Sequence, residues 1–242
     1  MLRWLLKVAL TVLLGGAATY ALVRSSPGYN SDERLLDPRL SAESKALIRA
    51  RRFVDLATSP TFNRPIAELI RERAPVTLEI MVIGIAGAWI LAAGLALIGG
   101  RLISAFTEAA LCVPAAVIAI LVFAAGGPAK ILIALVLFPR LFEFLRNLLT
   151  DAYARPHILC ARAKGLSPSR ILLWHVVPSC RAELIALAGI SITMAFGAAI
   201  PVETICDLPG LGQLAWKAAI ARDLPVLVSL TTMVTLVVQV TS

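Results

Sequence analysis

Long apolar runs with few charges constrain this chain most. Residues 184–202 and 224–240 contain no charged side chain at all. A helix needs about 20 mostly apolar residues to cross roughly 30 Å of hydrocarbon, and a helix satisfies its own backbone polar groups there. The chain is 59% hydrophobic and only 16% charged, whereas a soluble domain carries roughly 25% charged residues. The sequence therefore predicts an integral membrane protein.

The pattern favours about six such helices, which makes the chain an all-α, polytopic membrane protein. The first follows Arg3 and Lys7 and is expected to stay uncleaved, with a signal peptide as the alternative. The fourth has a short apolar core and continues into water, where Arg140, Glu143 and Arg146 can pair along one exposed face. The expected spans are residues 4–23, 76–98, a third span ending at about 125, a fourth starting near 129, 184–202 and 224–240.

Residues 24–75 differ from the rest, because they are polar and mixed in charge. Ser41 can cap a helix over residues 42–52. Pro65 can start a second helix over residues 66–73, whose apolar residues share one face. That second helix can lie in the membrane interface or be an ordinary amphipathic surface helix.

Small residues and one carboxylate mark the second and third spans. Gly84, Ala88, Ala92 and Ala96 recur at every fourth position, and such a stripe lets another helix approach closely. The third span contains Glu108; an intramembrane carboxylate usually faces protein or water, although this one lies near enough to the end to reach the headgroups. Two short glycine-containing turns, at residues 99–101 and 126–128, flank the third span.

The stretch Ala161–Pro178 is a basic insert between apolar runs. Just before it, Pro156 suits a first helical position, and Gly165 suits the left-handed residue that ends a helix. Ser167 is a good N-cap for a second helix, which Pro178 would stop or kink. This pattern of proline, glycine and serine residues predicts two helices joined by a tight turn, and an ordinary solvated loop is the alternative.

Several chemistries have no matching residues in the sequence. No G-x-x-x-x-G-K-[ST] loop occurs, so ATP chemistry must come from a partner. Two histidines and four cysteines in no C-x-x-C spacing predict neither a metal site nor a disulfide, and Cys112 is expected inside a span. No paired Asp or Ser-His set lies in the spans, so an intramembrane enzyme is disfavoured. The net charge of +8 fits basic cytoplasmic loops and anionic lipid headgroups and requires no nucleic acid.

Two motifs resemble one family of membrane proteins. Residues 161–166 read Ala-Arg-Ala-Lys-Gly-Leu, and residues 203–225 contain Asp-Leu-Pro-Gly-Leu-Gly after Glu203. In this order, with one span between them, they closely resemble the permease subunits of ABC importers for dipeptides, oligopeptides and nickel, the inner membrane components of binding-protein-dependent transport systems. Segments at 55–59, 64–70 and 73–77 also resemble the approach to that family's second span.

Three features depart from the family pattern. Pro156, His157 and Leu159 stand where the family usually has an acidic or polar residue and a tyrosine. Only Gly126–Lys130 joins the third and fourth spans, where relatives often carry a longer outer loop. The sequence stops at Gln239–Ser242, where relatives continue into a short cytoplasmic tail, which indicates a truncated chain or a reduced relative.

The resemblance implies an ABC importer type I permease-like fold, with residues 1–242 as a single transmembrane permease domain. It places the chain in the bacterial cytoplasmic (inner) membrane, with the N-terminus in the cytoplasm, residues 24–75 outside and a coupling loop at 150–181 inside. Basic residues alone do not favour this orientation, because thirteen of the 23 Lys and Arg then fall outside. The first helix must dominate the orientation, as it usually does.

The resemblance also implies two functional segments. In the coupling loop, small residues allow the ATPase to approach closely, and Leu166 provides an apolar side chain that inserts into it. Basic residues pair with acidic residues at the edge of the ATPase groove and so fix the position of the loop. In the second segment, at the outer mouth of the pathway, glycines supply the backbone turns of a gate, with a plain tight turn as the alternative. The coupling residues are Ala161, Arg162, Ala163, Lys164, Gly165, Leu166, Ser167 and Arg170, and the gate residues are Glu203, Asp207, Pro209, Gly210 and Gly212.

The implied function is that of a pore-forming subunit of an ATP-driven importer for peptides or a similar small solute. The implied partners are a second permease subunit in a heterodimer, two ABC ATPase subunits or domains, an extracytoplasmic solute-binding protein and the lipid bilayer. The chain itself is expected to be no enzyme and to need no cofactor. The alternative is a non-transporting membrane scaffold or assembly subunit that retains the permease fold. The cargo stays open between peptide, nickel chelate and other small solutes.

Overall fold

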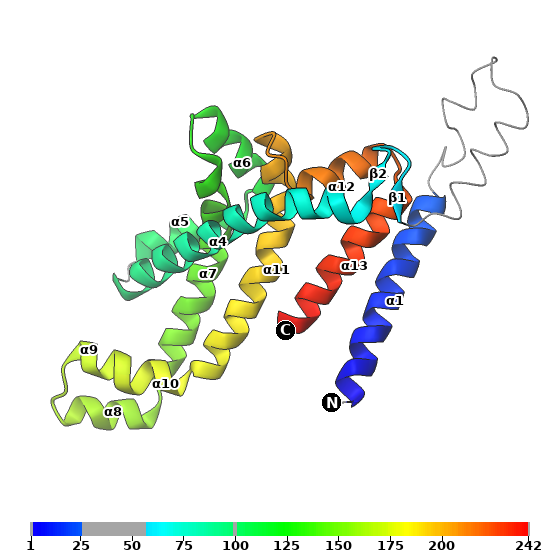
Figure 1. The fold of residues 1–242 in the computed structure, drawn as a ribbon. Helices are drawn as coiled ribbons and strands as arrows, with labels where there is room; N and C mark the ends of the chain where they lie inside the picture. The colour runs from blue at the N-terminus through cyan, green and yellow to red at the C-terminus, as the bar shows by residue number, and fades with distance from the viewer. Residues whose placement is uncertain (1, 26–56, 99–100, 242) are drawn as a thin grey trace, which may run out of the picture. The chain divides into compact units, whose positions relative to one another are not determined.

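The computed structural model describes residues 2–25, 57–98 and 101–241, and most of these are helical (Figure 1). The expected helix over 42–52 and the turn at Gly99–Gly100 lie outside the described residues. A short hairpin of two strands, β1 (Thr58–Ser59) and β2 (Arg64–Pro65), is an addition to the expected all-α pattern. Two compact units form: residues up to 77 with 207–240, and residues 78–206 with the last two.

Three described helices are long and apolar enough to cross a membrane, and a fourth crossing results if one bent helix pair counts as a single span. The prediction of a polytopic helical membrane protein is confirmed, but fewer than six of the described helices meet this requirement. The helix α1 (Leu2–Ser25) has a shorter apolar stretch, and α7 (Ala129–Tyr153) carries charges in its second half. The three helices are α4 (Ile66–Ile98), α11 (Arg181–Ile205) and α13 (Leu224–Thr241).

The second expected span is longer than the sequence pattern indicated. Helix α4 begins at Ile66 and continues without a break through Pro75. The predicted start of a helix after Pro65 is confirmed, but the prediction that this helix is short and ends at residue 73 is wrong. Proline inside a helix removes one backbone hydrogen bond, and burial of residues before and after Pro75, such as Leu69 and Ile80, holds the helix together.

The third expected span is broken. Helices α5 (Arg101–Leu111) and α6 (Ala115–Ala124) meet at an angle of 107°. The cause is Pro114, whose backbone is extended (φ −57°, ψ 139°) and whose ring disfavours a helical residue before it. Cys112 lies exposed in this turn, so its expected burial in a span is wrong. Glu108 lies on α5 with an exposed side chain.

The first unit contains α1, the strand hairpin, the start of α4, α12 (Leu211–Ile220) and α13. Helix α12 lies in the segment that connects α11 to α13, so this connection is partly helical. The side of α12 that carries Leu214 and Ala218 is fully buried between α4 and α13. Helix α1 contacts α13 through the hydroxyls of Thr19 and Thr231, whose oxygens are 3.5 Å apart. The core residues are Ile66, Leu69, Leu211, Leu214, Ala218, Val226 and Leu230.

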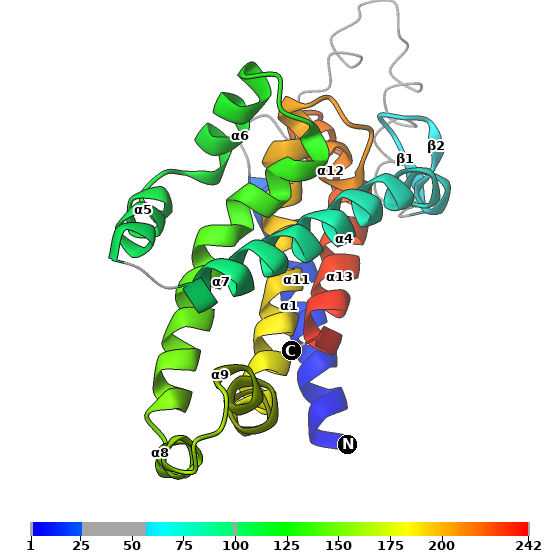
Figure 2. The same ribbon diagram turned by 90° about the vertical axis from the view of Figure 1, so that its left-hand side faces the viewer.

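The second unit is built on α7 and α11, which run side by side (Figures 1 and 2). Helix α4 joins them: the indole Nε1 of Trp89 donates to the Oγ of Ser191 on α11 at 3.1 Å. A Cβ on Gly84 would lie 2.5 Å from Cγ2 of Ile133 on α7. The close approach predicted from the stripe of small residues is thus confirmed at this position.

Candidate functional site

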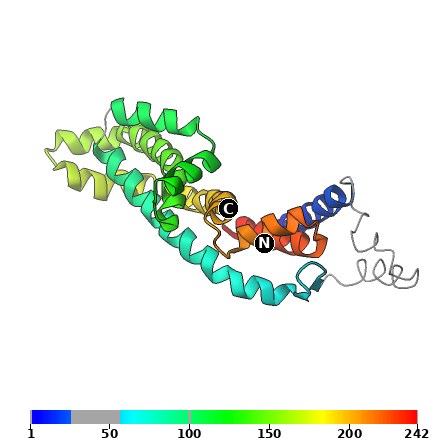
Figure 3. The same ribbon diagram turned by 90° about the horizontal axis from the view of Figure 1, so that it is seen from above.

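A helical hairpin connects the ends of α7 and α11. Its first arm is α8 (Pro156–Ala163), and its second arm comprises α9 (Pro168–Ile171), the π-helical turn η1 (Leu172–Val176) and α10 (Val177–Ser179). The two arms lie side by side when the chain is viewed from above (Figure 3). The prediction of two helices with a tight turn is confirmed.

Local chemistry explains where each arm begins and ends. Pro156 occupies the first position of α8 as expected, since its missing N–H has no partner there in any helix. Gly165 has a φ of +73°, which glycine adopts without the Cβ clash of other residues. Ser167 has the extended backbone of an N-cap, but its hydroxyl makes no capping bond and instead lies 3.5 Å from the Oγ of Ser169.

The second arm changes its winding before Pro178. A proline ring displaces the carbonyl four residues earlier and offers no N–H. The π-helical turn Leu172–Val176 precedes the proline, and the helix ends at Cys180. The prediction that Pro178 stops or kinks this helix is confirmed, with a widened turn as the way the backbone accommodates it.

The hairpin has its own apolar core. Ala161 is 4% exposed and packs inside this core, and Leu166 is half-buried against it. Two residues expected on the docking surface therefore support the hairpin from within. Their small or apolar side chains let the two arms approach. The core residues are Ala152, Ile158, Ala161, Ile171, Val176 and Cys180.

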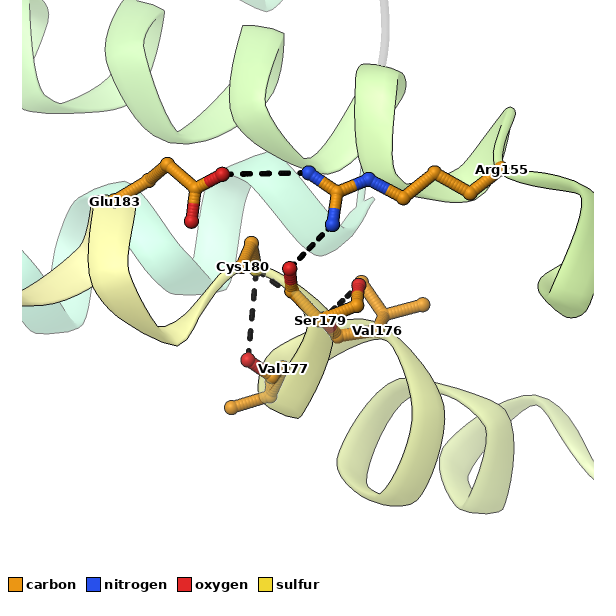
Figure 4. A network of polar contacts seen from close by, with 6 residues as sticks. All are labelled: Arg155, Val176, Val177, Ser179, Cys180 and Glu183. Carbon is orange, nitrogen blue, oxygen red and sulfur yellow. Dashed lines mark hydrogen bonds and ion pairs between the residues drawn. The ribbon is translucent and has the colours of Figure 1, made fainter.

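A polar clamp closes the base of the hairpin (Figure 4). The guanidinium of Arg155 donates to the carbonyl oxygen of Ser179 and, at 3.3 Å, to Oε1 of Glu183 on α11. Beside it, the Sγ of Cys180 donates to the carbonyl of Val176 at 3.2 Å. Burial raises the pKa of the Cys180 thiol above its ordinary value, and the nearby Glu183 carboxylate acts in the same direction. The clamp holds both arms to the ends of α7 and α11.

The outer surface of the hairpin is basic. The side chains of Arg162, Lys164 and Arg170 are exposed, and the Arg162 guanidinium lies 5.3 Å from the ring centroid of Tyr153. Such cation–π contacts restrict an exposed arginine. Ala163, Gly165 and Ser167 are exposed beside these residues.

Three exposed apolar side chains on the hairpin were missed by sequence reasoning. Leu159 is 54% exposed, Leu173 63% and Trp174 74%. Leu159 directly follows the buried Ile158, and Trp174 stands two residues before the buried Val176, so each lies on a different helical face from its buried neighbour. Only the structure shows which face is buried. These residues form the exposed apolar surface of the hairpin, whereas Leu166, which was expected on that surface, packs against the core.

The expected gate residues fall in two places. Glu203 lies fully buried in the last turns of α11, in the second unit, whereas the segment after Cys206 belongs to the first unit. In that segment Asp207 has a φ of +49°, and its Oδ1 accepts a bond of 2.6 Å from Nε2 of Gln213.

The two glycines of that segment, from which the backbone turns of a gate were expected, do not adopt the left-handed conformation. Gly210 caps α12 with a φ of −102°, and Gly212 lies within the helix. Pro209 is exposed, whereas both glycines are buried. The amide of Leu211 donates to Oγ1 of Thr77 at 2.7 Å, so the start of α12 is tied to α4. Asp207, rather than a glycine, makes the turn.

Comparisons with known proteins place these features in context. The family model described as binding-protein-dependent transport system inner membrane component matches residues 84–242. A "Putative peptide transport system permease protein" of Brucella abortus (strain 2308) is 26% identical over 208 residues, which cover 71% of this chain and 66% of the relative.

Two further relatives match a shorter part of the chain. The oligopeptide transport system permease protein AppB of Bacillus subtilis (strain 168) is 33% identical over 38% of this chain and 29% of its own length. The inner membrane ABC transporter permease protein YejB of Escherichia coli O157:H7 is 34% identical over 37% of this chain and 25% of its own length. The chain thus spans just under two thirds of the Brucella relative and less of the other two.

Proposed function

The chain belongs to the family of binding-protein-dependent transport system inner membrane components, and from this membership we propose that it is one pore-forming subunit of an ATP-driven importer. The family match and the apolar helices make it a multi-pass protein of the inner membrane. We propose peptides or a similar small solute as the cargo, because relatives are named as peptide and oligopeptide transport permeases. In this proposal, residues 1–242 act as one permease domain.

The clamped hairpin is the observation that carries the proposal. It is short, has its own buried core, and is fixed by Arg155 to the start of α11. A force on such a body reaches both α7 and α11, because the chain continues from the hairpin into each helix and Arg155 also bonds to α11. Its exposed surface combines basic residues with Leu159, Leu173 and Trp174, and aromatic anchors with a charged rim are typical of protein interfaces.

The proposed partners follow from this surface and from the sequence. Two ATPase subunits or domains would supply the ATP chemistry, because the chain has no phosphate-binding loop of its own, and one of them would dock on the hairpin. A second permease subunit would complete the pore as a heterodimer, and a solute-binding protein would deliver cargo outside. The hairpin then lies in the cytoplasm, as does the N-terminus. ATP-driven switching requires the nucleotide to favour one state by several kcal/mol.

The segment from Asp207 to Gly212 is proposed to lie at the outer mouth of the pathway, and Glu203 is proposed to contribute from α11. The placement of the Asp207–Gly212 segment is supported by the backbone of Asp207, which is left-handed and is held by the bond to Gln213. Residues in that conformation cost energy and concentrate at functional sites. The buried start of α12 fixes one end of the segment.

Changes in the hairpin test the proposal. Gly165→Pro cannot adopt the φ of +73°, and Leu166→Asp places a charge against the hairpin core. In purified complexes both should abolish cargo uptake while the membrane helices stay folded, and both should weaken co-purification with the ATPase chains. Ser169→Ala, an exposed change on the same turn, should leave uptake unchanged.

Two results would count against coupling through the hairpin. One is normal uptake by both variants, and the other is a wild-type chain that never co-purifies with an ATPase in mild detergent. ATP hydrolysis that a binding protein stimulates would separate a transporter from the alternative, a scaffold subunit that retains the fold.

A further inference from the structure

A cavity in the second unit shares no described lining residue with the hairpin or with the Asp207–Gly212 segment. Its volume is about 400 Å³, within the range of roughly 300–1,000 Å³ that small-molecule sites occupy. The end of α5 supplies one wall with Leu111, and α7 supplies the rest. The α7 residues recur at spacings of three and four, so they share one helical face: Arg140, Glu143, Phe144 and Asn147.

The depth of this face follows from its neighbour α11. Helix α11 is long and apolar enough to span the bilayer, and α7 has the same length of 25 residues and packs along it. Because the hairpin joins the two helices at one end, we infer that the middle of α7 lies at the depth of the middle of α11. Arg140 is close to the middle of α7. Charged side chains at such a depth face protein or a water-filled path rather than lipid.

The charged groups of the cavity have no partners among the described residues. The structure forms no ion pair between Arg140, Glu143 and Arg146 within that part of the chain, contrary to the prediction from their spacing. The Oε1 of Glu143 is enclosed and accepts no hydrogen bond from any residue that the structure describes. An enclosed acceptor without a donor is costly, so this oxygen is suited to a donor that arrives with a ligand.

The ligand class follows from the groups that meet here. The guanidinium of Arg140 offers paired donors that match a carboxylate. The carboxylate of Glu143 accepts from an ammonium group, and the amide of Asn147 can both donate to and accept from a peptide group. Phe144 and Leu111 provide apolar contact. A neutral or singly charged solute would leave one of the two charges unpaired.

We propose that this cavity is a contact site for a zwitterionic solute, such as a short peptide with free termini, during its passage through the membrane. In this assignment Arg140 binds the carboxylate, Glu143 binds the ammonium group, and both act as specificity-determining residues. The inference rests on the proposed function as an importer subunit and extends it from the family to named residues in the pathway.

A protection experiment on the complete transporter in lipid nanodiscs, without binding protein, tests the site. Leu111→Cys, in a chain that also carries Cys112→Ser, places a thiol on the apolar wall, and mass spectrometry follows its labelling by a membrane-impermeant maleimide. Dialanine should slow this labelling by about tenfold when its concentration is about ten times its Kd. N-acetyl-dialanine amide, which lacks both charges, should give no protection at the same concentration.

Charge-removing variants sharpen the test. Adding Arg140→Gln or Glu143→Gln should raise the Kd of dialanine, as measured from its protection of the thiol, by roughly tenfold or more, because each removes a charge-assisted hydrogen bond. Adding Arg146→Gln, on the same helix but outside the cavity lining, should leave protection intact.

Three outcomes would overturn the proposal. The first is a Leu111→Cys thiol that the reagent cannot reach in the assembled complex, which would mean that a partner chain covers this face. The second is labelling that dialanine does not slow. The third is equal protection by N-acetyl-dialanine amide. ATP-driven uptake by the wild-type complex is measured in parallel. Normal uptake without protection refutes the cavity assignment alone, whereas absent uptake refutes the importer function.

Discussion

The hydroxyl of Ser59 donates to the carboxylate of Asp223, which lies 164 residues further along the chain. Both side chains are buried in the first unit. The same carboxylate accepts from the backbone amide of Thr61 at 3.2 Å and, more weakly, from that of Val226 at 3.4 Å. One carboxylate therefore joins the strand hairpin before α4 to the first turn of α13.

We expect Ser59→Ala to lower the free energy of unfolding of the first unit by about 2 kcal/mol, since it removes a buried hydrogen bond to a charged group. Asp223→Ala should cost more, because it also removes the acceptor for two backbone amides. The midpoint of thermal unfolding in detergent measures both effects. Thr61→Ala keeps the backbone donor and serves as the control; equal midpoints for Ser59→Ala and Thr61→Ala would contradict this account.

Gly84→Ala should destabilise the second unit by roughly 1–3 kcal/mol, as expected when a side chain is forced into a packed interface. The new methyl group would lie 2.5 Å from Cγ2 of Ile133. Combining it with Ile133→Ala should cost less than the sum of the two single changes, because the smaller residue makes room. Unfolding in denaturant measures this cycle. Gly94→Ala is the control, since a Cβ there meets no atom within 4 Å; strict additivity would refute the close contact.

Arg155→Gln should open the base of the hairpin and raise the rate of amide hydrogen exchange across residues 156–179. Glu183→Gln should have a smaller effect, because an ion pair between side chains that are 36% and 48% exposed contributes only about 0–1 kcal/mol. Arg155→Lys should fall between the two, since it keeps the charge but loses the paired geometry of the guanidinium. If Glu183→Gln and Arg155→Gln gave the same exchange rates, the bond from Arg155 to the Ser179 carbonyl would not contribute to the stability of the hairpin.

Thiol labelling should separate Cys160 from Cys180. Cys160 is exposed on the first arm, whereas Cys180 is buried, and burial raises the pKa of its thiol. Because the thiolate is the reactive form, Cys180 should react much more slowly at neutral pH, and its rate should keep rising with pH beyond the ordinary thiol range. Mass spectrometry after brief treatment with a maleimide measures both sites.

The raised pKa of Cys180 also has a consequence for stability. The unfolded chain releases this proton at lower pH than the folded chain does. The contribution of the neutral thiol is therefore fully present below the ordinary thiol pKa and is lost as pH rises through the folded value. A Cys180→Ala variant should lose less stability between neutral and alkaline pH than the wild-type chain, and a parallel loss in both would contradict the assignment.

Turn and cap chemistry explains why the hairpin could be predicted so closely. Pro156, Gly165 and Pro178 each have one strong backbone preference, and each acts at the predicted position. Such preferences are local, so they can be read before the tertiary contacts are known. The close approach at Gly84 was predictable for a related reason, because a repeat of small residues marks a helix interface.

Other features depend on what packs against them. Pro75 lies inside α4 without breaking it, because residues on both sides of it are buried. Pro114 does break its helix, and the local pattern does not distinguish the two prolines. Leu166 and Leu159 are both leucines of the same hairpin, and only the path of the second arm places one against the core and the other in the open.

The sequence by itself determined a helical membrane protein, its family motifs and the helix boundaries that glycine and proline impose, because hydrophobicity and backbone preference are properties of short segments. The tertiary structure decided which side chains meet: Ser59 with Asp223, Arg155 with Ser179 and Glu183, and the charged face of α7 with an open cavity. These pairings join residues far apart in the chain, and they depend on how the helices pack, which no local preference encodes.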